Sequence, residues 1–260
     1  MMTLATSAYA EQPIFDEMPR WKGGFGVQIL QEYRRSDQRL DGREKVDVGS
    51  EENVHIFHVQ GVYTWDKSIR MTVKVPMVID ARSSIPSTTG ASATQSHSGI
   101  GDPTLALPLK SYFNLDGRSG SWTLTPQIRF PGGRVGDYTI YPHQWGTGLF
   151  AGYETETHQI ILGLGASAWH FYGEHPGNTE GEFALGLNFR MGRYSGHFKW
   201  KNHFIYEDET IIYRGGPVLY GRITDEIHGQ LQWKRDFYTD RGTRGYAGTD
   251  SFRIGLAFVY

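Results

Sequence analysis

The sequence of 260 residues contains no cysteine. This absence excludes a disulfide scaffold, a cysteine nucleophile and a zinc or iron–sulfur site with cysteine ligands. Long hydrophobic runs are also missing. None approaches the roughly 18 residues of a transmembrane helix, and the longest, near 160–169, is broken by Gly163 and Gly165. The 26 basic residues are matched by 28 acidic ones, which excludes a globally basic nucleic-acid binder.

Glycine and aromatic residues, in contrast, are abundant. The chain has 33 glycines, and Phe, Trp and Tyr make up 14% of it, while the hydrophobic total is only 38%. Many glycines and aromatics with few aliphatic residues favour short strands and turns over packed helices. A polar average composition is compatible with a membrane β-barrel, because only alternate residues of its strands face lipid.

Apolar and polar residues alternate with a period of two in twelve segments, which predicts twelve strands. They are 25–34, 54–65, 69–78, 102–113, 122–130, 144–154, 158–172, 181–191, 197–206, 211–223, 227–233 and 251–260. No helical period competes over a comparable length. Because segments near ten residues fit a tilted strand crossing a bilayer, we predict an all-β fold, a single closed antiparallel transmembrane β-barrel.

The connections between these segments differ in length in a regular way. Long ones (36–53, 80–98, 131–143 and 238–248) mostly alternate with short ones (66–67, 155–157, 192–196 and 224–226), and the short connection 207–209 breaks the trend. Outer-membrane barrels have short periplasmic turns and longer outer loops. An even number of strands then places both termini on the periplasmic side of a bacterial outer membrane.

The chain ends on a strictly alternating strand. Large apolar residues occupy every second position up to the aromatic terminus, namely Phe252, Ile254, Leu256, Phe258 and Tyr260. This pattern resembles the C-terminal membrane-insertion signal of outer-membrane barrels, so the barrel-assembly machinery is an expected partner. The alternative is an edge strand of a soluble protein, which seldom leaves five large apolar residues on one face.

The first ten residues, MMTLATSAYA, end in a small-x-small pattern of the kind that signal peptidase cuts. We interpret residues 1–10 as a signal-peptide remnant, 11–20 as an N-terminal periplasmic segment and 21–260 as the barrel domain. An ordinary N-terminus that happens to contain this pattern is the alternative.

The two faces of the predicted strands differ in chemistry. Aromatic residues near strand ends suit belts at the two membrane interfaces; they are Trp65, Phe113, Trp122, Phe130, Trp145, Tyr153, Phe198, Tyr206, Trp233 and Tyr260. The opposite, lumen-facing positions carry twelve bases, namely Arg34, Arg70, Lys74, Lys110, Arg129, Arg190, Lys199, Lys201, Arg214, Arg222, Lys234 and Arg253, and four acids, Glu32, Asp102, Glu154 and Glu182. A lumen lined by one sign of charge favours the opposite ion. Alternatively, these charges pair across the lumen and only hold the wall.

Several short glycine motifs are similar to those of a known family. Gly99-Ile100-Gly101-Asp102 follows Lys74-Val75-Pro76, and Phe130-Pro131-Gly132-Gly133 and Gly146-Thr147-Gly148 come later. In order and spacing they resemble the outer-membrane family labelled putative MetA-pathway of phenol degradation, over about residues 20–260. The resemblance implies a Gram-negative outer-membrane barrel that passes hydrophobic or aromatic compounds. Asp102, near Lys74 and Lys110, is interpreted as part of a wall ion pair.

An enzyme is not favoured by the sequence. The candidates are His97 beside two serines, His143, and His170 with His175, but none belongs to a nucleophile motif, and no metal or dinucleotide motif is present. We predict no catalytic residue, metal or cofactor. The expected function is a channel or uptake protein for small solutes, with outer-membrane lipid and the solute as partners and no nucleic acid.

Three questions stay open at this level. The lumen is either open or plugged by inward side chains, by residues 1–20 or by a folded loop. The chain is alternatively a non-transporting outer-membrane barrel with phospholipase-like or adhesive outer loops. A soluble lipocalin-like binder is the third interpretation.

Overall fold

The computed structural model describes residues 21–86, 93–115, 118–133, 140–191 and 194–260. Within them the chain forms sixteen strands: β1 (Gly24–Ser36), β2 (Gln38–Gly42), β3 (Glu44–Val46), β4 (Glu51–Thr64), β5 (Arg70–Ile85), β6 (Ala93–Ile100), β7 (Thr104–Ala106), β8 (Leu109–Leu115), β9 (Arg118–Arg129), β10 (Gly146–Glu156), β11 (Ile160–Phe171), β12 (Asn178–Met191), β13 (Tyr194–Glu207), β14 (Thr210–Arg222), β15 (Ile227–Ala247) and β16 (Asp250–Val259). No helix in these ranges is long and apolar enough to cross a membrane.

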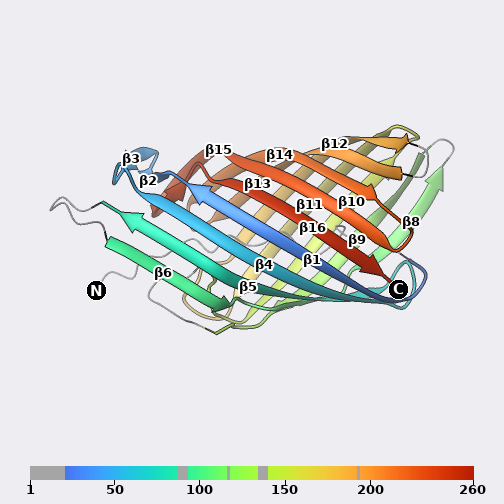
Figure 1. Ribbon diagram of the computed structural model, residues 1–260, viewed down its shortest axis with the longest axis horizontal. Coiled ribbons are helices and arrows are strands. Elements are labelled where there is room, and N and C mark those ends of the chain that lie inside the picture. The colour runs from blue at the N-terminus through green and yellow to red at the C-terminus, as the bar shows by residue number, and fades with distance from the viewer. Residues whose placement is uncertain (1–20, 87–92, 116–117, 134–139, 192–193) are drawn as a thin grey trace.

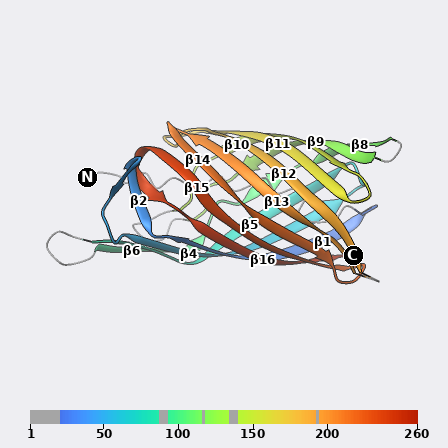
Figure 2. The same cartoon turned by 90° about the horizontal axis from the view of Figure 1, so that it is seen from above.

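The strands close into one antiparallel barrel (Figures 1 and 2). Each wall strand pairs with the next along the chain, and β16 pairs with both β15 and β1, with Glu32 opposite Arg253 in the last pairing. Because β6, β7 and β8 together form one wall strand and the β2–β3 hairpin lies outside the wall, the barrel has twelve strands. The predicted fold class is confirmed.

The barrel is apolar outside and polar inside, the reverse of a water-soluble protein. In β4 every even residue from Glu52 to Thr64 is buried, including His58 and Gln60, whereas the odd positions face outward. In β16 Phe252, Ile254 and Leu256 are each about half exposed. Large exposed apolar surfaces of this kind mark contact with a membrane or a partner, and their alternation with inward polar residues is that of a membrane barrel.

Aromatic side chains gather at both ends of the outer face. At the end with the short turns, the Trp122 and Tyr153 rings lie 4.5 Å apart, and Tyr153 also stacks on Phe113. At the other end Phe130 packs edge-on against Trp145, with ring centroids 4.9 Å apart. Amphipathic rings suit the headgroup level of a bilayer, so the two clusters fit the predicted belts.

The wall strand predicted as one segment over 102–113 is broken into β7 and β8, and the same wall strand also includes β6, which lies before the predicted segment. β7 joins β5 to β9 by only three residue pairs on each side, whereas β6 pairs with β5 and β8 with β9. Pro103 and Pro108 lack the backbone N–H that a ladder needs. Gly99 has φ +128°, which L side chains rarely adopt. The barrel is therefore least continuous along this strand.

The predicted asymmetry of the connections is present, with one difference. β1 begins and β16 ends at the end that also carries the short turns, since Gly26 pairs with Val259. At the opposite end, three segments predicted as loops contain strands. Residues 80–98 include the end of β5 and most of β6. Residues 36–53 include the β2–β3 hairpin, and β15 continues to Ala247 and pairs with β2 (Figure 1). The short connection 207–209 also lies at this long-loop end.

Candidate functional site: the charged lumen

The fourteen predicted pore-lining residues occupy inward positions, but their exposure differs along the barrel. Eight are buried, namely Arg34, Arg70, Lys74, Asp102, Arg129, Lys199, Lys234 and Arg253. Lys110, Glu182, Lys201 and Arg214 are half-buried, and Arg190 and Arg222 are exposed near the short turns. Arg190 and Arg222 thus meet solvent near the short turns, whereas Arg70 at the same end is buried beside the Trp21 ring.

A single carboxylate organises the interior where the first strand meets the last. Glu32, 1% exposed, accepts from Arg34 Nε at 2.5 Å and from Arg253 at 2.8 Å. His58 Nε2 lies 2.9 Å from Oε2, the oxygen that Arg253 also contacts, and the Ser251 hydroxyl donates to Oε1 at 3.3 Å. These partners come from β1, β4 and β16, so the cluster ties the closing seam together.

Further acids at inward positions were not among the predicted four. Glu180 of β12 lies 2.7 Å from His203 Nε2 of β13, and Asp236 of β15 forms an ion pair with Arg214 of β14, with Nε 3.0 Å from the carboxylate. Glu52 and Glu207 are buried near the long-loop end. The charge of the lumen is therefore more evenly balanced between acids and bases than predicted. Strand alternation, extended by up to three residues past the predicted segment ends, was the signal that would have found these four acids.

Three inward aromatic side chains were also missed. Trp169 and Phe171 of β11 stack with centroids 6.1 Å apart, and the guanidinium of Arg129 lies 4.6 Å from the Trp169 ring centroid. The Phe150 ring covers Gly152 and Gly165, where a Cβ would collide with it. A cation held over buried aromatic faces is attracted by the ring quadrupole. The lumen wall toward the long-loop end thus combines charged and aromatic side chains.

A cavity opens at the short-turn end. It has a volume of about 850 Å³ and is lined by residues that include Arg190, His197, Tyr220, Arg222 and His228. The rings of His197, Tyr220 and His228 stack in sequence across β13, β14 and β15, with centroids 4.8 and 5.8 Å apart.

Deeper in the lumen a smaller cavity shares His197 and Tyr220 and reaches Lys199, Lys201 and Glu182. Lys199 Nζ donates to Glu154 at 3.4 Å. At the same end the Trp21 ring packs inside the barrel against Val62 and Ala257. We call the larger cavity at the short-turn end the vestibule; Lys199 and Lys201 thus line its inner end.

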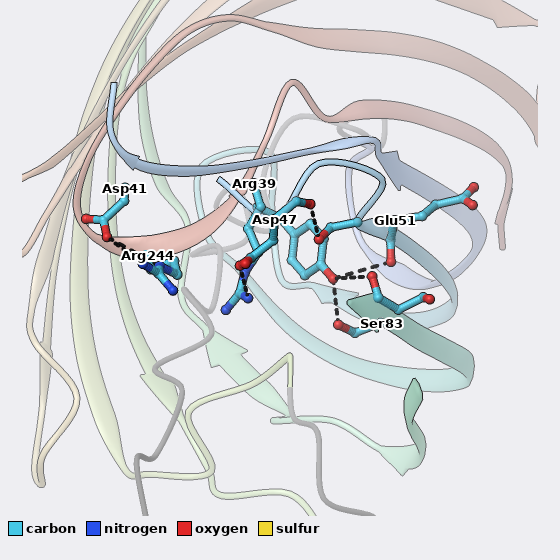
Figure 3. A network of polar contacts seen from close by, with 9 residues as sticks. Arg39, Asp41, Asp47, Glu51, Ser83 and Arg244 are labelled. Atoms are coloured by element: carbon cyan, nitrogen blue, oxygen red, sulfur yellow. Dashed lines mark hydrogen bonds and ion pairs between the residues drawn. The ribbon is translucent and has the colours of Figure 1, made fainter. Parts of the chain in front are cut away.

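The long-loop end is covered by the β2–β3 hairpin and the extension of β15. Figure 3 shows their polar contacts: Arg39 donates to Asp47 at 2.8 Å, and Arg244 donates to Asp41. The buried Tyr246 hydroxyl lies 2.7 Å from the Ser83 hydroxyl of β5 and also contacts backbone carbonyls of β4 and β5. The extension of β15 is thereby fastened across the mouth.

Arg43 and Asp240 form an exposed pair at this rim, 2.6 Å apart. The hydrogen bond from Arg43 lowers the pKa of the Asp240 carboxyl, and the same contact raises the pKa of Arg43.

Asp102 does not form the predicted ion pair with Lys74 and Lys110. Its two oxygens accept backbone hydrogen bonds from Gly132 at 2.8 Å and His143 at 3.0 Å, and the His143 ring lies 3.3 Å away. The role is structural, as predicted, but the partners belong to the connection between β9 and β10. Spacing along the chain gave no sign of them.

The histidine candidates do not assemble into a recognisable catalytic group. His97 and His143 meet ring to ring at 5.9 Å, His170 faces outward and His175 lies 3.5 Å from Glu207. Among the described residues, no three His, Asp or Glu side chains are grouped in a way that holds a metal ion.

Comparison with solved structures supports the fold. An outer-membrane channel from Pseudomonas putida F1 matches with a TM-score of 0.72 at 15% identity, covering 96% of this chain and 100% of that one. The KdgM porin in complex with disordered oligogalacturonate matches with a TM-score of 0.51 at 7% identity, covering 90% and 99%. Neither a protein-family model nor a curated protein sequence matches. The fold is that of outer-membrane barrels, and the family suggested by the glycine motifs stays a prediction.

Proposed function

We propose that this protein is an outer-membrane channel that passes small solutes, with its short turns and both chain termini on the periplasmic side. One observation carries the proposal: a closed barrel exposes apolar side chains outward and encloses a row of charged and aromatic ones. Ionisable groups inside a membrane protein are costly and mark pathways for ions or solutes. The two similar structures are themselves described as a channel and a porin.

The solutes we propose are small hydrophobic, aromatic or anionic molecules. Lys199 and Lys201 at the inner end of the vestibule, with Arg190 and Arg222 at its rim, offer positive charge on the route from the short-turn side. The stacked rings of His197 and Tyr220 offer a flat surface beside it. Charge of one sign in a narrow passage focuses the potential on the opposite ion.

Single-channel recording in planar bilayers tests the proposal. Under a salt gradient we expect the reversal potential to indicate a preference for anions. The double substitution Lys199→Gln and Lys201→Gln should move it toward cation preference, because two positive charges leave the lumen wall. The matched control is Lys45→Gln, which removes a lysine exposed on the outer hairpin.

The outcomes separate the parts of the proposal. An inserted but silent barrel contradicts the channel function. Steady openings with the same reversal potential in the wild type and the double variant contradict only the role of the lysines.

A further inference from the structure

Both ends of the connection between β9 and β10 dock on the same point of the wall. The Asp102 carboxylate receives the backbone N–H of Gly132 through one oxygen and that of His143 through the other. Asp102 is 1% exposed, and the His143 ring also approaches the Gly132 carbonyl at 3.3 Å. Hydrogen bonds to a charged group are roughly twice as strong as neutral ones. This carboxylate therefore holds both ends of the connection on the wall.

Glycine lets the two backbones meet closely. A methyl group on Gly132 would overlap the carbonyl of Gly101, and one on Gly101 would overlap the ring of Tyr141. Gly133, the next residue, has no neighbour within 4 Å of the same added atom. The contact is therefore specific to Gly132 and to the break between β6 and β7.

The residues just before His143 lie inside the barrel. Ile140 and Tyr141, 8% and 3% exposed, form one apolar cluster with Val54, Ile56, Val78 and Ala81. The last four are inward residues of β4 and β5. They form a patch of apolar lumen wall among polar neighbours, and the loop covers it.

The layer that Ile140 and Tyr141 form on the inner wall is thick relative to the diameter of the lumen. Twelve strands spaced about 4.8 Å apart and tilted by about 40° enclose a wall about 24 Å across between backbones. Stacked polypeptide layers lie about 10 Å apart. A layer of chain packed on the inner side of the wall thus reduces the open diameter of the lumen by close to half.

We infer that Ile140–His143 form the constriction of this channel and that Asp102 is the positioning residue that holds them in the lumen. The inference rests on the proposed channel function. It adds the element that sets the size limit for solutes, which neither the lumen charges nor the barrel size explains.

The test compares Gly132→Ala with Gly133→Ala, two adjacent single-methyl changes of which only the first meets backbone. Asp102→Asn, which keeps the shape of the side chain, is the second variant. Each protein is refolded, checked for heat-modifiable gel migration, and measured for conductance and for exclusion of polyethylene glycols of graded size. Hydrogen exchange of peptides that cover 130–145 reports the loop directly.

We expect Gly132→Ala and Asp102→Asn to exchange faster in the loop. Both should conduct about twofold more than the wild type, because a layer about 10 Å thick no longer occupies part of a lumen about 24 Å across. They should also admit larger polymers, while Gly133→Ala stays at the wild-type values.

Three results overturn the inference in distinguishable ways. If the loop exchanges faster but conductance and polymer limit do not change, the loop is not the constriction, and the channel function stands. If hydrogen exchange is unchanged in both variants, Asp102 is not the positioning residue. A set of inserted barrels that are all silent contradicts the channel function itself, and the constriction with it.

Discussion

Glu32→Gln is the most informative test of how the lumen holds the barrel together. The substitution keeps the size of the side chain but removes the charge that faces Arg34, Arg253 and His58 at 2.5, 2.8 and 2.9 Å. Because Glu32 is 1% exposed, water cannot replace the lost charge easily. Removing one partner of a buried ion pair costs about 3–5 kcal/mol.

The matched control is Glu51→Gln in β4. Glu51 pairs with Arg35 at 3.2 Å, but both side chains are about half exposed, and pairs of that kind contribute about 0–1 kcal/mol. We expect the melting temperature to fall by about 10 °C for Glu32→Gln, at roughly 2–4 °C per kcal/mol for a chain of this size. For Glu51→Gln we expect a fall of at most a few degrees.

The assay is the loss of heat-modifiable gel migration, measured with temperature and with urea in lipid vesicles. Equal midpoints for the two variants would refute the reasoning. They would mean that the lumen at the β1–β16 seam is wet enough for water to solvate Arg34 and Arg253 without Glu32.

Three further predictions concern the two ends of the barrel. Tyr246→Phe removes the hydroxyl that bonds Ser83, so hydrogen exchange should accelerate in the β2–β3 hairpin. The free energy of unfolding of the barrel should fall by no more than about 1–2 kcal/mol. Unchanged exchange would contradict this role. The lowered pKa of Asp240 means that its bond to Arg43 stabilises the hairpin above the ordinary carboxyl range and is lost as pH falls through that lowered pKa. Exchange in β3 should therefore rise on acidification in the wild type but not in Asp240→Asn. Tyr260→Ala should lower the fraction of protein assembled in membranes, measured by gel migration, relative to Val259→Ala; equal fractions would remove Tyr260 from the insertion signal.

The alternation of apolar and polar residues by itself determined which face of each strand meets lipid. Side chains of a strand point to opposite faces in turn, so Arg34, Lys74 and Arg253 were placed correctly at inward positions from spacing alone. The same period gave the number of wall strands, since each crossing of the barrel is a separate alternating segment.

Only the tertiary structure decided what the inward residues contact. Glu32 lies opposite Arg253 because the first strand pairs with the last, and no local pattern carries the register between segments so far apart. The same holds for Asp102, whose partners Gly132 and His143 lie near the two ends of the connection between β9 and β10, far from it along the chain. A period of two specifies a face, whereas closure of the barrel and the path of its loops specify the neighbours.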